Sequence, residues 1–143
     1  MQRRTFIKTT GMCCLGGLLV QACGTAAYYA QFSRLEKRLA VPKSEFRFLN
    51  KKGETVERSY VLLKPDGAAF PIALFRQPDG YTACLLRCTH QGCEVEVQGD
   101  RYACPCHGSE FSTKGAVLTG PAEQPLQTFQ IEEDDARIYI LLV

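Results

Sequence analysis

Both histidines of this chain lie beside cysteines, in two hexapeptides that also hold four of its eight cysteines. The first reads CTHQGC, from Cys88 to Cys93, and the second reads CPCHGS, from Cys104 to Ser109. Thiolates and imidazoles bind soft and borderline transition metals well. Any fold of this chain therefore has to accommodate two short, cysteine-rich segments that can meet around a metal.

The residues from Glu45 onward predict short β-strands separated by turns. Pro-Asp-Gly, a strong turn signal, follows the first predicted strand and the second. Strict alternation over 94–98 is typical of a half-buried strand, and Asp134-Asp135 between two apolar runs is typical of a hairpin. Because no sustained helical period occurs here, we expect a small, antiparallel all-β domain with both hexapeptides in its loops. The predicted strands are 59–64, 71–76, 81–86, 94–98, 126–133 and 136–142.

Charge gives no indication of a nucleic-acid partner. The formal net charge is +2, with 17 basic and 15 acidic residues, but Arg3, Arg4 and Lys8 all lie near the N-terminus. The rest of the chain is close to neutral, and its basic residues form no stripe of the kind that binds phosphate backbones. We therefore expect no nucleic-acid function.

The N-terminus is similar to a twin-arginine export signal. Arg3 and Arg4 precede Phe6, Ile7 and Lys8, and an uncharged, largely apolar stretch follows them. Proteins that use this route are exported already folded, commonly with a cofactor inside. The resemblance implies a protein of the bacterial cell envelope, in the periplasm or on the outer face of the cytoplasmic membrane.

The sequence leaves open three ways in which this N-terminal segment could be processed. The segment LVQAC, ending at Cys23, resembles the lipobox of bacterial lipoproteins, in which the cysteine becomes lipidated. Residues 9–33 carry no charge and are long enough to form an uncleaved membrane anchor. Simple cleavage is the third outcome. Either of the first two would tether the domain to a membrane.

A tether is expected between the leader and the domain. Alternating charges and the spacing of Leu35 and Leu39 favour a short amphipathic helix there, which Pro42 would end. The expected divisions of the chain are 1–22 (signal peptide or anchor), 23–44 (tether) and 45–143 (β domain).

Three kinds of site can be built from Cys-x-His in one loop and Cys-x-x-His in the other. A structural zinc site accepts two cysteines and two histidines, but zinc ligands usually include closely spaced cysteine pairs, and Cys93 and Cys106 would have no role. A pair of disulfides suits an exported protein but leaves both histidines unexplained. A 2Fe–2S cluster bound by two cysteines and two histidines uses both histidines and leaves one cysteine over in each loop.

The two hexapeptides resemble the paired motifs of Rieske proteins from cytochrome bc complexes, C-T-H-x-G-C and C-P-C-H-G-S. The resemblance covers residues 45–143. It includes GPAEQPL (120–126), which is similar to the proline-containing loop that covers the cluster in that family. It implies an antiparallel β fold with a cluster-binding subdomain. It further implies that Cys88 and Cys104 bind one iron of a 2Fe–2S cluster and that His90 and His107 bind the other. By the same resemblance, Cys93 and Cys106 form a disulfide joining the loops. Gly120 and Pro121 would belong to the covering loop.

Three further positions bear on the properties of such a cluster. Ser109 matches a serine that donates a hydrogen bond to the cluster in the family. Phe111 stands where the family often has a tyrosine, and it cannot donate a second hydrogen bond. Gln91 stands where the family often has a leucine, so we expect a wetter loop tip that is less suited to an apolar quinone pocket.

The resemblance implies an electron-transfer subunit without an independent catalytic site. One expected role is a membrane-tethered subunit that accepts electrons from quinol in a bc-type or alternative respiratory complex and passes them to a c-type cytochrome. The alternative is a small subunit of a periplasmic molybdenum oxidoreductase such as arsenite oxidase, and a structural zinc module is more distant. Cys84 is expected to be a buried core thiol.

Overall fold

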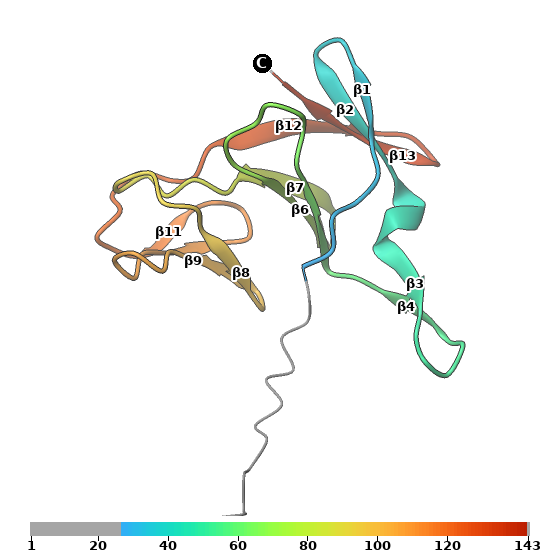
Figure 1. The fold of residues 1–143 in the computed structure, drawn as a ribbon, viewed down its shortest axis with the longest axis horizontal. Coiled ribbons are helices and arrows are strands. Elements are labelled where there is room, and N and C mark those ends of the chain that lie inside the picture. The colour runs from blue at the N-terminus through green and yellow to red at the C-terminus, as the bar shows by residue number, and fades with distance from the viewer. Residues whose placement is uncertain (1–26, 143) are drawn as a thin grey trace, which may run out of the picture.

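Antiparallel strands build the fold, which the computed structural model describes over residues 27–142 (Figure 1). These residues form thirteen strands and a single short 3-10 helix, η1 (Lys43–Phe46), so the expected all-β class is confirmed. No helix in this range has the length and hydropathy needed to cross a membrane. The predicted export signal and Cys23 lie outside the described residues.

The largest sheet contains seven strands, and every neighbouring pair in it is antiparallel. The predicted Pro-Asp-Gly turns join its three consecutive strands at one edge. The Asp134 carboxylate forms another turn, because its Oδ1 accepts the N–H groups of Ala136 (2.8 Å) and Arg137 (2.7 Å). The strand order is β1 (Ser33–Leu35), β2 (Arg38–Pro42), β13 (Arg137–Leu141), β12 (Thr128–Glu133), β7 (Gly80–Leu85), β6 (Ile72–Gln77) and β5 (Tyr60–Leu63).

A four-stranded sheet lies beside the large one and carries the hexapeptides. Its order is β11 (Val117–Thr119), β10 (Glu110–Ser112), β9 (Arg101–Ala103) and β8 (Glu96–Gln98). The first hexapeptide connects β7 to β8, and the second connects β9 to β10. A separate hairpin of β3 (Arg47–Leu49) and β4 (Thr55–Glu57) projects from the other end of the molecule (Figure 1).

Residues 61–63 of β5, 72–75 of β6 and 83–84 of β7 are buried, whichever face their side chains point to, which accounts for the apolar runs in these strands. On one face, side chains that include Leu62 and Phe75 share a core with residues of the four-stranded sheet. On the other face, side chains that include Val61 and Leu74 share a second core with β2 and β13. The first core therefore connects the large sheet to the strands that carry both hexapeptides.

Residues 33–42 do not form the expected tether with a short helix. In the structure they form the β1–β2 hairpin at one edge of the large sheet instead. An amphipathic helix would place Leu35 and Leu39 on one face, but Leu39 is fully buried and Leu35 is 39% exposed. Strand β2 pairs with β13 along five residues. This long-range pairing and the burial of β2 outweigh the local helical spacing, and they extend the folded domain to the N-terminal side of residue 45.

The last residues of the uncharged stretch 9–33 also belong to the fold. Ala30 is buried, and its N–H donates to the carbonyl of Leu62 (2.8 Å). The N–H of Leu62 in turn donates to the carbonyl of Tyr28 (2.9 Å). A membrane anchor in this protein therefore has to end before Tyr28.

Leu39→Ala is expected to lower the free energy of unfolding by about 2–5 kcal/mol, because the change leaves a cavity in the second core. Leu35→Ala is the matched control at an exposed position and should change that free energy by less than about 0.5 kcal/mol. Denaturant titration followed by circular dichroism measures both values. Equal effects of the two substitutions would contradict the assignment of β1 and β2 to the sheet.

Candidate metal centre

The first hexapeptide forms a closed loop between β7 and β8. The N–H of Cys88 donates to the carbonyl of Cys93 (2.8 Å), and the N–H of Gly92 donates back to the carbonyl of Cys88 (2.9 Å). A β-bridge between Arg87 and Glu94 closes the base of the loop. These bonds satisfy polar backbone groups of the loop and fix the position of Cys88 at its start.

The second hexapeptide repeats this hydrogen-bond pattern at the same offsets. The N–H of Cys104 donates to the carbonyl of Ser109 (2.8 Å), and the N–H of Gly108 donates to the carbonyl of Cys104 (3.0 Å). Gly92 and Gly108, the fifth residues of their hexapeptides, both have a φ of 78°, which glycine adopts without a steric penalty. The two loops therefore share their backbone hydrogen bonding, although histidine is third in one and fourth in the other.

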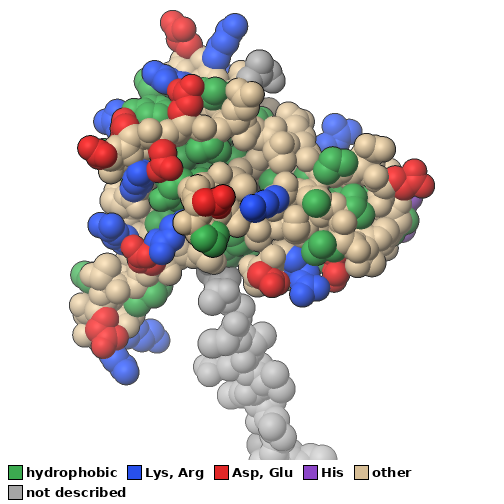
Figure 2. All heavy atoms as spheres, turned by 180° about the vertical axis from the view of Figure 1, so that it is seen from behind, with side chains coloured by type: hydrophobic (Ala, Val, Ile, Leu, Met, Phe, Trp, Pro, Cys, Tyr) green, Lys and Arg blue, Asp and Glu red, His purple; other side chains and the backbone are tan. Residues whose placement is uncertain are grey.

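The four predicted ligands divide into two buried thiols and two exposed imidazoles. Cys88 and Cys104 are free and buried, whereas His90 and His107 are exposed. The two imidazole rings have centroids 5.0 Å apart and planes at 85° to each other. The histidines lie at one end of the molecule in Figure 2, so a partner can approach the site from the imidazole side.

A disulfide joins Cys93 to Cys106 and so links the two loops, as the resemblance implied. The sulfur of Cys104 lies within 4.8 Å of both disulfide sulfurs. These three sulfurs do not form a metal site by themselves, because metals bind thiolates and a disulfide sulfur is not one. The thiols left in the loops are Cys88 and Cys104. With the two imidazoles they provide the donor set that fits a Rieske 2Fe–2S cluster.

A third loop, residues 120–127 between β11 and β12, is attached to both hexapeptides. The N–H of Ala122 donates to the Oγ of Ser109 in the second hexapeptide (3.0 Å). The Oγ1 of Thr89 in the first hexapeptide donates to the carbonyl of Gln124 (2.6 Å). The loop is therefore held over the region where the two hexapeptides meet.

The other residues predicted around the cofactor differ in their burial. Gly120 and Pro121, joined by a cis peptide bond, are exposed at the start of the third loop. Ser109 and Phe111 are fully buried. The Ser109 oxygen accepts the Ala122 N–H, so its own O–H is available to donate. Phe111 contributes only apolar surface to the first core.

Cys84 is buried in the first core, as predicted. Burial raises the pKa of its thiol to about 11, so it is protonated at neutral pH. Burial also raises the pKa of Tyr102, whose hydroxyl lies beside this thiol and makes no hydrogen bond of ordinary geometry with the residues described. Neither group is activated for reaction, and both contribute to packing.

A pocket beside His90 is lined mainly by polar side chains. Gln91 is exposed at this loop tip, so the tip is polar as the sequence predicted. The other polar residues that line the pocket are Arg87, Thr89, Gln124 and Gln127.

Several contacts that support the site were missing from the sequence prediction. The turns at Gly92 and Gly108 could have been predicted from the sequence, since a glycine occupies the fifth position of each hexapeptide. No sequence pattern predicts the Thr89–Gln124 and Ser109–Ala122 hydrogen bonds, because they join residues separated by 35 and 13 positions. Only the folded chain brings these groups together.

Comparison with known proteins places this arrangement among iron–sulfur domains. The model of the family described as Rieske [2Fe-2S] domain matches residues 50–130. The cytochrome b6-f complex iron-sulfur subunit 2 of Nostoc sp. is 31% identical over 86 residues, which cover 59% of this chain and 43% of that protein. The subunit of the same name from Trichormus variabilis is 28% identical over 125 residues, which cover 86% of this chain and 52% of that protein. This chain thus spans about half the length of either relative.

Among solved structures, a plasma membrane Rieske protein of the cyanobacterium Synechocystis is 30% identical. The alignment covers 57% of this chain and 85% of that chain, with a TM-score of 0.49. The family match favours a 2Fe–2S centre over a structural zinc site or a pair of disulfides.

Cys106→Ser is expected to lower the free energy of unfolding by about 2–5 kcal/mol, because it removes a cross-link between residues 13 positions apart. Denaturant titration of the variant and the wild type measures this loss. Cys93→Ser removes the same bond, so each single variant and the double variant should lose nearly the same amount. A Cys106→Ser protein as stable as the wild type would rule out a stabilising role for the bridge.

Proposed function

The chain belongs to the Rieske [2Fe–2S] domain family, and we propose from this that it transfers single electrons as one subunit of a respiratory assembly. The observation that carries the proposal is that each loop supplies one buried thiol and one exposed imidazole, and that the two imidazole rings have centroids 5.0 Å apart. A 2Fe–2S cluster supplies the one-electron chemistry when bound. We assign the chain no independent catalytic site.

In this proposal the chain holds the cluster through one thiol and one imidazole from each loop. Cys88 and Cys104 would bind one iron, and His90 and His107 would bind the other. Imidazole is neutral where thiolate is anionic, so the two histidines make the site less negative and easier to reduce. Their exposure leaves the imidazole side open to an electron donor or acceptor.

We propose quinol as the electron donor and a c-type cytochrome as the acceptor. The support is that the relatives from Nostoc and Trichormus variabilis are named as iron–sulfur subunits of cytochrome b6-f complexes. The exposed end that carries both histidines would then alternate between the two partners, and the folded β domain would keep the three loops in place during that exchange.

A second candidate role is supported by the polar pocket beside His90. Gln91, Gln124 and Gln127 line it together with Arg87, and such a surface suits a polar protein partner better than an apolar quinone. The partner in that case would be the large subunit of a periplasmic molybdenum oxidoreductase. The neighbouring genes discriminate, because a cytochrome b gene supports the quinol role and a molybdopterin-subunit gene supports this one.

We propose that the protein works outside the cytoplasmic membrane of a bacterium and is held there by a tether. The support is the paired Arg3 and Arg4, which suit export in the folded state, and the Cys93–Cys106 disulfide, which persists in oxidising compartments. The tether would be either a lipidated Cys23 or an uncleaved anchor that ends before Tyr28.

Substitution of any proposed ligand tests the cluster assignment. His90→Ala, His107→Ala, Cys88→Ser and Cys104→Ser should each abolish the Rieske electron paramagnetic resonance signal, because each iron needs both of its protein ligands. Gln91→Leu, a change at the exposed residue next to the proposed ligand His90, is the control and should keep the signal. A normal signal in any of the four ligand variants would overturn the assignment of that residue.

Ser109→Ala is expected to lower the midpoint reduction potential. The serine O–H is available to donate to the cluster, and such a bond favours the reduced, more negative state. A hydrogen bond to a charged acceptor contributes about 1.5–3 kcal/mol. If about 1–2 kcal/mol of that differs between redox states, the loss is about 40–90 mV, from about 59 mV per tenfold change.

Protein-film voltammetry measures this shift. Ser109→Thr keeps a hydroxyl at the same position and should stay near the wild-type potential, which separates the hydrogen bond from general disturbance of the loop. An unchanged potential in Ser109→Ala with an intact Rieske spectrum would contradict tuning by Ser109.

A further inference from the structure

The β3–β4 hairpin presents apolar and cationic side chains to solvent, at the end of the molecule opposite the histidines (Figures 1 and 2). Leu49 is 69% exposed and Phe48 is 39% exposed. Lys51 and Lys52 at the tip are also exposed, and neither forms an ion pair within residues 27–142. The tip therefore combines free positive charge with exposed apolar surface.

The tip is ordered by the side chain of Asn50. Its Oδ1 accepts the N–H groups of Lys52 (2.9 Å) and Glu54 (3.0 Å), and its Nδ2 donates to the Glu54 carboxylate (2.7 Å). The nearest acidic side chain is thus bonded to asparagine inside the turn. The two lysines remain available to an external anion.

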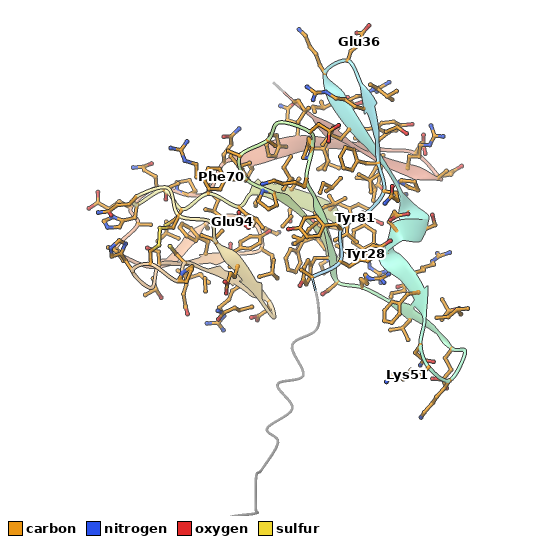
Figure 3. All side chains as sticks on the ribbon, viewed as in Figure 1. Tyr28, Glu36, Lys51, Phe70, Tyr81 and Glu94 are labelled. Carbon is orange, nitrogen blue, oxygen red and sulfur yellow. A yellow bond between two sulfur atoms is a disulfide. The ribbon has the colours of Figure 1, made fainter. Side chains whose placement is uncertain are left out.

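The base of the hairpin lies against the point where the described chain begins. The Arg58 guanidinium is 3.8 Å from the centroid of the Tyr28 ring and 4.3 Å from the centroid of the Phe48 ring. Figure 3 shows Tyr28 at the base of the hairpin and Lys51 at its tip. Arg58 therefore fixes the hairpin to the residues that follow the N-terminal segment.

Either tether in the proposed function ends close to this point. A lipidated Cys23 would be separated from Tyr28 by about 18 Å of extended chain or less, and an anchor has to end before Tyr28. A bilayer held so close is within reach of a hairpin that starts at the same place. The short link also gives the hairpin a high effective concentration at the membrane, so weak contacts suffice for docking.

From this juxtaposition we propose that the tip of the β3–β4 hairpin docks on the anionic lipid surface of the membrane that tethers the protein. The inference rests on the membrane tether of the proposed function. Lys51 and Lys52 would pair with lipid phosphates, while Leu49 would enter the boundary between headgroups and acyl chains. Docking at this end leaves the histidine end free for a redox partner.

A tryptophan introduced at the tip tests the proposal, because the chain has no tryptophan of its own. Full-length, cluster-loaded Leu49→Trp protein is reconstituted in vesicles of phosphatidylcholine and phosphatidylglycerol, with and without brominated acyl chains. Its emission should shift to shorter wavelength in the vesicles and be quenched by the brominated lipid. Leu118→Trp, at a position 56% exposed on β11, is the matched control and should show neither change.

Charge reversal tests the role of the lysines. Adding Lys51→Glu and Lys52→Glu to the Leu49→Trp protein should lower the ratio of docked to undocked hairpin by at least about 25-fold, from about fivefold for each positive charge removed near an anionic surface. Quenching by the brominated lipid should then be lost. Vesicles of phosphatidylcholine alone should give a comparable loss for the protein that keeps both lysines.

Vesicle flotation separates failure of this inference from failure of the tether. If Leu49→Trp protein floats with the vesicles but is quenched no more than Leu118→Trp protein, docking on lipid is overturned and the tether stands. Protein that does not float with the vesicles overturns both. The Rieske spectrum of each variant shows that the domain is folded in every comparison.

Discussion

The Cys93–Cys106 disulfide and the matching backbones of the two loops determine how the four proposed ligands are arranged. Each loop closes on its own first cysteine through two backbone hydrogen bonds, so Cys88 and Cys104 start from equivalent positions. Those bonds act only within a loop. The disulfide is the covalent link that sets one loop against the other. The two exposed imidazole rings, one from each loop, have centroids 5.0 Å apart.

The hydrophobic core and a third loop hold the two hexapeptide loops in position. The first core joins the four-stranded sheet to strands β6 and β7, so the strands that carry the hexapeptides pack directly against the large sheet. The loop 120–127 adds a second restraint through its bonds to Thr89 and Ser109. Ser109 thus has two functions in our proposal, since its oxygen holds the covering loop and its hydrogen is available to the cluster.

The two ends of the molecule have different chemistry, which suits a tethered electron carrier. One end carries the imidazoles and a polar pocket, and the other carries the β3–β4 hairpin with its free lysines and exposed leucine. The chain enters the fold at the base of this hairpin, where Arg58 contacts Tyr28. Membrane attachment and partner binding would then occupy separate surfaces, so neither excludes the other.

The sequence alone predicted the all-β class and six of the strands, because these depend on residue types and on neighbours close together in the chain. The turn at Asp134 is such a local feature. The sequence did not reveal that Leu39 belongs to a core strand, since its pairing partner Ile140 is distant in the chain and the local spacing favoured a helix. Spacing also left the cysteine pairing open until a family resemblance suggested it. The tertiary structure decided these points, together with the contacts of the covering loop, because they depend on strand pairing and packing between residues that only folding brings together.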